Sequence, residues 1–332
     1  MSGGLQVGEE RASELTAEWA ELWRASGCAP VFASPWWQEL WWRAFEPDAQ
    51  PCTVAIRDAG GRLTGVAPLM RRDGALWLAG DHEVMDYMDV VCLPEDRPAV
   101  LSAVAEALAA EGAREVRLWG LSGRASTAQA LAEPAERAGW SYERGDEAVC
   151  PTIELPGSWD EYLARLGKHD RHELRRKLRR FAELGDEPRV VPLSQPDEVA
   201  AAMSAFIRLA TESRHDKAHF MTARMERFFR AMAPAMAEAG VLRLYQLHLD
   251  ERPVGSLIAF RVGEELQLYN SGYDPALAGY SVGLVHKAMV LRHAIDEGLA
   301  RYDLLRGNER YKYDLGARDN PVYTVMLRRE AG

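Results

Sequence analysis

The segment 266–312 constrains the fold more than any other part of the chain, because its hydrophobic period changes twice. Residues 265–270 alternate with the period of two that is typical of a half-buried strand. Turn-forming residues follow, and from Ser281 apolar side chains recur at helical spacing until Gly298, a typical helix stop. Residues 302–305 predict another strand, which a charged loop follows. This order predicts a strand–helix–strand unit with two parallel strands.

The start of the predicted helix is a candidate anion site. A helix that begins just after a strand points its free backbone N–H groups toward the end of that strand, where a phosphate or carboxylate can bind. Gly283 lies in the first turn, and its missing Cβ lets a ligand approach the backbone. The loop after the second strand should bring Arg306, Glu309, Tyr311 and Lys312 to the same edge. This pattern favours an enzyme, although a unit with a solvated charged loop explains the spacing equally well.

The same residues resemble a known family. The motif D-x-x-R-G-x-x-x-Y-K runs from Asp303 to Lys312, after a Ser-Gly-Tyr-Asp run at 271–274 and a Ser-Val-Gly-Leu run at 281–284. Together they resemble the C-terminal motif of the CelD/BcsL-like acetyltransferases, in the Fem-type branch of the GNAT superfamily. The resemblance extends from about Phe32 to Lys312. It implies an α/β (α+β) fold of two tandem GNAT-like domains, each a mixed, mostly antiparallel sheet flanked by helices.

An internal repeat supports two domains without reference to any family. The 332 residues suffice for two domains of ordinary size, and the second half repeats the order of elements in the first. Gly65 follows one hairpin turn as Gly255 follows another. The Glu-Gly pair at 111–112 precedes a late strand, as does the pair at 297–298. We therefore predict an N-terminal domain over 1–150 and a C-terminal acyltransferase domain over 151–332.

The composition is that of a globular protein that does not bind nucleic acid in general. Its net charge is −10, which argues against general binding of a polyanion, although a local basic patch is compatible with it. No apolar run approaches the roughly 20 residues that span a bilayer, and the N-terminus lacks the apolar stretch of a signal peptide. The four cysteines are far apart and show no metal spacing. We expect a cytoplasmic protein with reduced thiols and no metal.

The two halves differ where a phosphate would bind. The first half has Glu95 and Asp96 before its helix and no glycine, and these acids repel phosphate from the helix start. We therefore expect the donor site in the second half. The first half is expected to be structural or to shape the acceptor pocket, for which Asp86 and Tyr87, in a predicted strand at 86–91, are the candidates.

A basic helix and a loop supply further candidates for substrate binding. The helix is predicted from Ser158 to about Phe181, with Arg171 and Arg175 on a flank beside its apolar face. These arginines could contact an anionic group of the donor or acceptor, and a solvated face is the alternative. Helices are also predicted at 196–213 and 222–239. The loop between them carries His215 and Arg214, which could touch substrate; a metal pair of His215 with His219 is not expected, because no acid completes it.

The resemblance also implies where the donor and the reacting groups lie. In GNAT-type proteins the donor occupies a V-shaped gap between two parallel strands, here 266–271 and 302–305. The residues implied to hold it are Tyr269, Asn270, Ser271, Ser281, Val282, Gly283 and Arg306. Glu309 is the first candidate for general base and Asp303 the second, and for each a salt bridge to Arg306 or Lys312 that fixes the loop is an equal alternative. Tyr311 could protonate the leaving thiolate, Lys312 could stabilise the oxyanion, and Tyr273 could contact the substrate.

The function implied is an N-acyltransferase that moves an acyl group, in the first instance acetyl, from acyl-CoA to an amine of a small molecule, sugar or peptide. The segment 279–283 departs from simple GNAT enzymes because it has one glycine in the first turn instead of two close ones. Fem-type relatives share this feature, and some use aminoacyl-tRNA. Such tRNA users commonly carry a coiled-coil arm, for which the sequence shows no heptads, so acyl-CoA is preferred to tRNA. A non-catalytic double-GNAT protein that binds a ligand is the remaining alternative.

Overall fold

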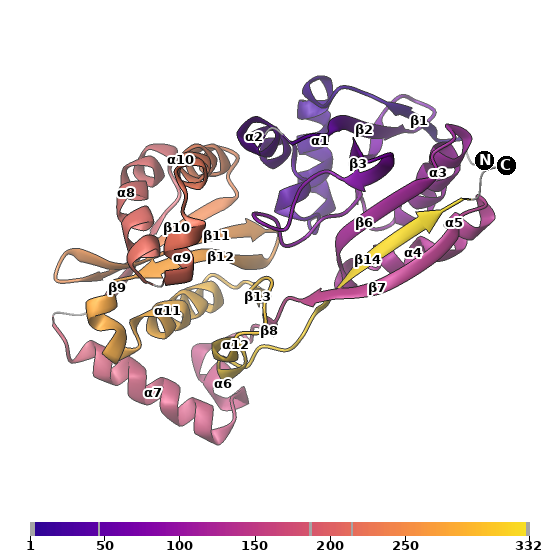
Figure 1. The fold of residues 1–332 in the computed structure, drawn as a ribbon. Helices are drawn as coiled ribbons and strands as arrows, with labels where there is room; N and C mark the ends of the chain where they lie inside the picture. The colour runs from indigo at the N-terminus through magenta and orange to yellow at the C-terminus, as the bar shows by residue number, and fades with distance from the viewer. Residues whose placement is uncertain (1–3, 46, 186–187, 214, 330–332) are drawn as a thin grey trace. The chain divides into compact units, whose positions relative to one another are not determined.

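The computed structural model describes residues 4–45, 47–185, 188–213 and 215–329 (Figure 1). These residues form two compact units. The first unit runs to Val149 and also includes the segment that begins at Asn320, and the second unit is Cys150–Asp319. The predicted second domain of 151–332 is therefore corrected at its C-terminal end. Local patterns do not indicate this correction, because the last strand joins its sheet by pairing with strands about 200 residues away.

The first unit is built on a mixed sheet with the strand order β1-β2-β3-β4-β6-β14-β7, and β5 pairs with β3. The strands are β1 (Gln6–Glu9), β2 (Gln50–Arg57), β3 (Leu63–Arg72), β4 (Ala75–Leu78), β5 (Val91–Cys92), β6 (Glu115–Ser122), β7 (Ser141–Val149) and β14 (Pro321–Arg328). The helices are α1 (Ala12–Ser26), η1 (Val31–Ala33), α2 (Pro35–Phe45), α3 (Arg97–Ala110), η2 (Gly123–Ala125), α4 (Thr127–Ala130) and α5 (Ala132–Arg137).

The second unit is built on a sheet with the order β8-β13-β12-β11-β10-β9. Its strands are β8 (Thr152–Glu154), β9 (Arg189–Leu193), β10 (Leu242–Leu249), β11 (Arg252–Val262), β12 (Glu265–Tyr273) and β13 (Arg301–Asp303). Its helices are α6 (Trp159–Arg165), α7 (Lys168–Ala182), α8 (Pro196–Ser213), α9 (His215–Phe220), α10 (Ala223–Glu238), η3 (Pro275–Tyr280), α11 (Val282–Asp296) and α12 (Arg310–Asp314). Figure 1 shows α8 and α10 on one face of this sheet and α11 with α7 on the other.

Both sheets are mixed and mostly antiparallel, which confirms the predicted fold class. In the second unit, β12 and β13 run parallel, with pairs from Glu265–Arg301 to Gln267–Asp303. Beyond these pairs β13 ends, whereas β12 continues to Tyr273. The core on the α11 face is formed by apolar residues of β11, β12, α6, α7 and α11. The predicted gap between the two parallel strands therefore opens after Gln267.

The internal repeat has a physical basis in the two strand glycines. A Cβ on Gly65 would lie 2.8 Å from Cγ1 of Val100 in α3, and a Cβ on Gly255 would lie 2.8 Å from Nδ1 of His286 in α11. In each unit, a glycine thus lets the helix that follows pack directly on the sheet. Each of these helices is also followed by a left-handed glycine, Gly112 or Gly298, with φ of 79° and 75°.

In the first unit, residues 79–90 cross the position where the second unit has its gap. Met88 N–H donates to the Gly120 carbonyl at 2.9 Å, and the Trp119 indole donates to the Leu78 carbonyl at 2.8 Å. Gly120 is left-handed, with φ of 69°, and a Cβ there would lie 2.7 Å from the Met88 nitrogen. The prediction of a strand at 86–91 was wrong, because residues 86–90 follow this irregular crossing and strand pairing begins at Val91.

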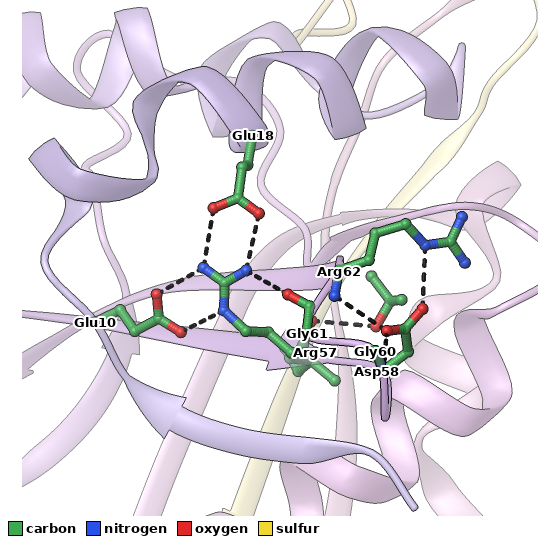
Figure 2. A network of polar contacts seen from close by, with 9 residues as sticks. Glu10, Glu18, Arg57, Asp58, Gly60, Gly61 and Arg62 are labelled. Carbon is green, nitrogen blue, oxygen red and sulfur yellow. Dashed lines mark hydrogen bonds and ion pairs between the residues drawn. The ribbon is translucent and has the colours of Figure 1, made fainter. Parts of the chain in front are cut away.

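An ion-paired cluster fixes the N-terminal part of the first unit (Figure 2). The Arg57 guanidinium, on β2, donates to both carboxylate oxygens of Glu10 at 2.8 Å and to Glu18, on α1, at 2.8 Å. It also donates to the Gly61 carbonyl at 2.9 Å. These hydrogen bonds from Arg57 lower the pKa of Glu10 and of Glu18. The cluster ties the helix α1 to the β2–β3 hairpin through charge-assisted hydrogen bonds.

Two predicted elements of the second unit differ from the structure. The basic helix predicted as continuous from Ser158 is two helices, because the chain is extended at Leu166 (ψ of 146°) and Gly167 (ψ of 149°) between α6 and α7. The predicted loop between α8 and α10 contains the short helix α9. The Ser158 side chain caps α6 by accepting from the Glu161 N–H at 3.3 Å, as its residue type predicts.

Candidate active site

A β-bulge in β12 directs its side chains toward the gap. Ile258 pairs with Asn270 and Ala259 pairs with Leu268, so Tyr269 is the extra residue. Before the bulge, Leu268 lies in the core on the α11 face. After it, Ser271 faces that side, because its cross-strand partner Leu257 belongs to the same core. A bulge reverses the alternation of a strand in this way, and here it turns Ser271 and Tyr273 toward the start of α11.

A cavity of about 260 Å³ lies where these elements meet. It brings together the end of β12, the start of α11, the charged loop and α9. Its lining residues are Lys217, Ser271, Tyr273, Ala278, Ser281, Val282, Gly283, Leu284, Lys287, Glu309 and Tyr311. The helix start and the charged loop, which the sequence predicts to share one edge of the sheet, therefore line one cavity.

The start of α11 offers two backbone amides to this cavity. Ser281 precedes the helix in a left-handed conformation, with φ of 59°, and its side chain makes no capping hydrogen bond. Its carbonyl accepts from the N–H groups of Leu284 and Val285 at 2.9 and 3.0 Å. The amides of Val282 and Gly283 precede these first intrahelical bonds, at the positive end of the helix dipole.

Gly283 has a packing role that the sequence does not reveal. A Cβ at this position would lie 2.9 Å from Cδ1 and 3.0 Å from Cε1 of Tyr273. The glycine therefore accommodates the Tyr273 ring against the first turn of α11. The sequence predicts that the missing Cβ of Gly283 leaves space for a ligand. In the structure the Tyr273 ring occupies that space.

Lys312 holds the charged loop together. Its side chain is buried, and Nζ donates to the carbonyls of Leu305, Arg306 and Gly307 at 2.9, 2.8 and 3.0 Å. It also lies 3.0 Å from Oε2 of Glu309. Lys312 does not line the cavity, and these contacts direct its ammonium into the loop, so the predicted oxyanion role does not agree with its position.

Asp303 also has a place in the loop rather than at the cavity. Its side chain is fully buried, and Oδ1 accepts from the Leu305 N–H at 2.7 Å. Leu305 itself is left-handed, with φ of 54°, a conformation that costs energy for a branched residue. Asp303 therefore stabilises the turn that leads out of β13, and of the two candidate bases Glu309 is the one that lines the cavity.

Glu309 and Tyr311 are the predicted proton-transferring groups that reach the cavity. The Glu309 side chain is 51% exposed and is held by Lys312. The Tyr311 ring lies beneath Lys287, with Nζ 5.0 Å from the ring centroid. A carboxylate fixed in orientation and a phenol, both facing one cavity, can accept a proton and return one.

Three predicted donor-binding residues of β12 and the charged loop remain, namely Tyr269, Asn270 and Arg306. The Tyr269 ring stacks on Phe229 at 5.8 Å and packs against Phe260 at 5.1 Å, which directs it to the α10 face. The Asn270 side-chain oxygen accepts from Lys217 at 3.3 Å. Arg306 contributes its carbonyl to Lys312. None of these three predicted donor-binding residues is among the described residues that line the cavity.

The candidates for substrate binding are more scattered. Arg171 donates weakly to the Ala164 carbonyl at 3.4 Å, and Arg175 is exposed. Arg214 lies outside the described residues, and of His215 the structure describes the backbone at the start of α9. Asp86 and Tyr87 lie in the first unit, where the Tyr87 hydroxyl is buried and accepts from the Asn320 amide at 3.1 Å.

A second cavity, of about 310 Å³, lies between α7, α12 and the first turn of α11. Leu284 lines both cavities. The second cavity is lined by His169, Asp170, Glu173, Leu174, Lys177, Leu284, Arg310, Asp314 and Leu315. Neither Arg171 nor Arg175, which helical spacing places together on one flank of α7, lines this second cavity.

Sequence reasoning missed two lysines that line the first cavity, Lys217 and Lys287. Lys287 follows Gly283 by one helical turn, and this spacing could have indicated that both face the same site. No comparable signal points to Lys217, because α9 reaches β12 through tertiary packing. Its ammonium donates to the Ser271 carbonyl.

Comparison with known proteins gives one family match. Residues 168–313 match the family model of the acetyltransferase (GNAT) domain. The match lies within the second unit and includes every residue that lines the first cavity. The second unit thus resembles a GNAT-type acetyltransferase domain over these residues. No curated protein matches the sequence significantly.

Solved structures share the fold of the whole chain. FemX superposes with a TM-score of 0.67 at 10% identity, covering 96% of each chain. L-PGS from Bacillus licheniformis gives 0.59 at 12% identity, covering 98% of this chain and 93% of that one. A conserved protein of unknown function from Bacteroides thetaiotaomicron gives 0.60 at 14% identity, covering 98% and 100%. The chain therefore shares the fold of FemX, as the resemblance to Fem-type proteins implies, and the narrower CelD/BcsL-like assignment stays a prediction.

Proposed function

We propose that this protein is an N-acyltransferase that moves an acyl group from acyl-CoA to an amine. The observation that carries the proposal is the separation of β12 from β13 beside the start of α11, where Glu309 and Tyr311 line the same cavity. An acyl-CoA has an extended arm that can pair with a free strand edge and a diphosphate that suits a helix start. The matched GNAT domain supports this donor.

The residues suggest how the transfer would proceed. The donor arm lies along β12 beyond Gln267, where β13 no longer pairs with it. Glu309 accepts a proton from the acceptor ammonium, and the free amine attacks the thioester carbonyl. A C–N bond forms and the C–S bond breaks. Tyr311 donates its proton to the leaving thiolate, and the phenol is restored by the second proton that the nitrogen loses on forming the amide.

Lys312 acts on this reaction through Glu309. Its buried ammonium lies 3.0 Å from Oε2 and holds the carboxylate in a fixed orientation at the cavity. An ionised, oriented carboxylate is the state that a general base needs before the acceptor arrives. Lys312 is therefore a positioning residue in this proposal, and Glu309 is the base.

A transferase that uses aminoacyl-tRNA is the second candidate, favoured by one specific observation. The helix α7 exposes Arg175, Arg179 and Arg180, although the chain as a whole is acidic. Exposed arginines on one helix can contact the phosphates of RNA. The similarity to FemX is one of fold and leaves the donor open.

The two donors and a non-catalytic ligand-binding role can be separated in two experiments. Thermal unfolding with acetyl-CoA measures binding, because a ligand at 100 times its Kd stabilises the folded state by about 2.7 kcal/mol. Release of free thiol from acetyl-CoA is then followed with amino sugars, amino acids and short peptides, using Glu309→Gln as the control.

Amine-dependent thiol release that is lost in Glu309→Gln would support the proposal. Binding of acetyl-CoA without release by any amine would favour a ligand-binding role. Transfer from aminoacyl-tRNA, with no stabilisation by acetyl-CoA, would establish the second candidate in its place.

A further inference from the structure

The first cavity is cationic in an otherwise acidic protein. Lys217 from α9 and Lys287 from α11 both line it. Glu309 is the carboxylate among the described lining residues, and it is paired with Lys312. The net charge of the chain is −10, so two ammonium groups at one cavity make the charge there more positive than that of the chain as a whole. This charge favours an anionic ligand.

The backbone supplies few amides for such a ligand. Ahead of α11 the chain forms η3, where the N–H groups of Leu277 and Ser281 donate to the carbonyls of Asp274 and Ala278 at 3.0 and 2.9 Å. The Ala276 N–H donates to the Asp274 carboxylate at 2.9 Å. These amides are therefore used within the turn. A diphosphate carries several acceptor oxygens, which the amides of Val282 and Gly283 cannot all satisfy.

The two lysines are placed to complete the site. The Lys287 ammonium lies 3.3 Å from the Gly283 carbonyl and 5.0 Å from the centre of the Tyr311 ring, so it extends along the first turn of α11. The Lys217 ammonium contacts the Ser271 carbonyl and the Asn270 side-chain oxygen, both neutral acceptors. Either ammonium gains a charge-assisted hydrogen bond if a phosphate oxygen enters the cavity.

We propose that Lys217 and Lys287 form a cationic pair that binds the diphosphate of the donor, in place of the backbone amides that a glycine-rich turn would provide. The inference rests on the proposed acyl-CoA donor. It assigns binding of the donor's diphosphate to two lysine side chains in addition to the backbone amides at the start of α11. Binding of the diphosphate by Lys217 would also affect β12. When Lys217 moves to the diphosphate, the Ser271 carbonyl is released on the part of β12 that β13 does not pair with, and an N–H group of the donor arm can then donate to it.

Titration calorimetry with inorganic pyrophosphate tests the pair directly. Lys217→Met and Lys287→Met should each weaken pyrophosphate binding about tenfold, since a hydrogen bond to a charged group is lost. The double variant should bind more weakly than either single variant. Lys168→Met is the matched control, because Lys168 is exposed on α7 and lines neither cavity. Arginine at either position should retain most of the affinity, and wild-type affinity should fall as salt is raised.

Titration with CoA, ADP and a short RNA that ends in CCA distinguishes the sources of phosphate. CoA binding that weakens in both lysine variants supports the inference. Unchanged pyrophosphate affinity in both variants, or no binding to the wild type, overturns it even where thiol release is observed. If pyrophosphate binds through the lysines but no amine releases thiol from acetyl-CoA, the inference stands and the proposed function fails. Lysine-dependent binding of the RNA without binding of CoA contradicts the diphosphate assignment.

Discussion

The ammonium of Lys312 lies 3.0 Å from Oε2 of Glu309, although the lysine is buried and the glutamate is half exposed. The two residues are three positions apart: Glu309 directly precedes the short helix α12, and Lys312 lies within it. The same ammonium donates to three consecutive backbone carbonyls. One side chain thus both shapes the loop and fixes the carboxylate that faces the cavity. A substitution of Lys312 should therefore affect both the stability of the loop and the proposed reaction.

Removing this ammonium should destabilise the protein. In Lys312→Met, three carbonyls and one carboxylate lose their shared partner, which should lower the free energy of unfolding by about 3 kcal/mol. Urea denaturation measures the change. Arg310→Met on the same helix is the control, because Arg310 is 90% exposed and its substitution should cost less than about 0.5 kcal/mol. Equal stability of the two variants would show that the loop does not depend on Lys312.

Replacing the proposed base should affect catalysis and leave the fold intact. Glu309→Gln keeps the shape of the side chain but cannot take up the proton, so kcat should fall at least about a hundredfold. Because Glu309 is half exposed, the melting temperature should change little. Steady-state kinetics with the amine found active, together with a thermal melt, measure both. A loss of less than about fivefold would assign Glu309 a structural role with Lys312.

Gly272 should be among the least replaceable residues of the second unit. A Cβ at this position would lie 2.2 Å from the Ala210 nitrogen and 2.3 Å from the Leu209 carbonyl carbon, so α8 rests directly on β12. Gly272→Ala should therefore cost about 3 kcal/mol or more of unfolding free energy, since backbone cannot yield as a side chain does. Gly279→Ala is the matched control, with no atom within 4 Å of the added Cβ. Similar urea midpoints for the two variants would contradict this packing.

Stability should fall in mild acid because of His286. Burial lowers the pKa of His286 to about 3, with a smaller contribution from Lys287, and its Nε2 has no hydrogen-bond partner among the described residues. The unfolded chain takes up a proton near pH 6.5, whereas the folded chain resists it until about pH 3. The contribution of neutral His286 to the free energy of unfolding is therefore complete above pH 6.5, and it is lost progressively as the pH falls from 6.5 toward 3.

The substitution His286→Leu removes this group and should flatten the pH dependence of stability between pH 7 and 5. Urea denaturation at several pH values gives the slope for both proteins. The remaining dependence below pH 4.5 should include Glu10 and Glu18, whose pKa values Arg57 lowers. A variant with the slope of the wild type would assign the acid sensitivity to other groups.

The sequence predicts elements well where one local period extends over a whole element. The helices at 196–213 and 222–239 correspond to α8 and α10, and the helix that begins at Ser281 corresponds to α11. Prediction failed where contacts between residues distant in the sequence overrode the local pattern. Residues 86–90 read as a strand, but the crossing chain bonds Met88 to Gly120 instead.

The site was predicted in outline, and the side-chain directions were not. Gly283, Glu309 and Tyr311 were expected at one cavity and lie there, whereas the side chains of Tyr269 and Lys312 point elsewhere. The bulge at Tyr269 decides which residues of β12 face the gap, and it arises from pairing with β11. A single inserted residue reverses the face of every following side chain, and the local sequence does not specify it.

By itself, the sequence determined the strand–helix–strand unit, the start of its helix at Ser281 and the duplication, because each depends on short-range periodicity and on glycine positions. The tertiary structure alone decided that Lys217 reaches β12, that Lys312 turns into its own loop and that β14 completes the first sheet. These features depend on contacts between residues far apart in the chain, or on which neighbours bury a long side chain. Such contacts are fixed when the elements pack, and no local period encodes them.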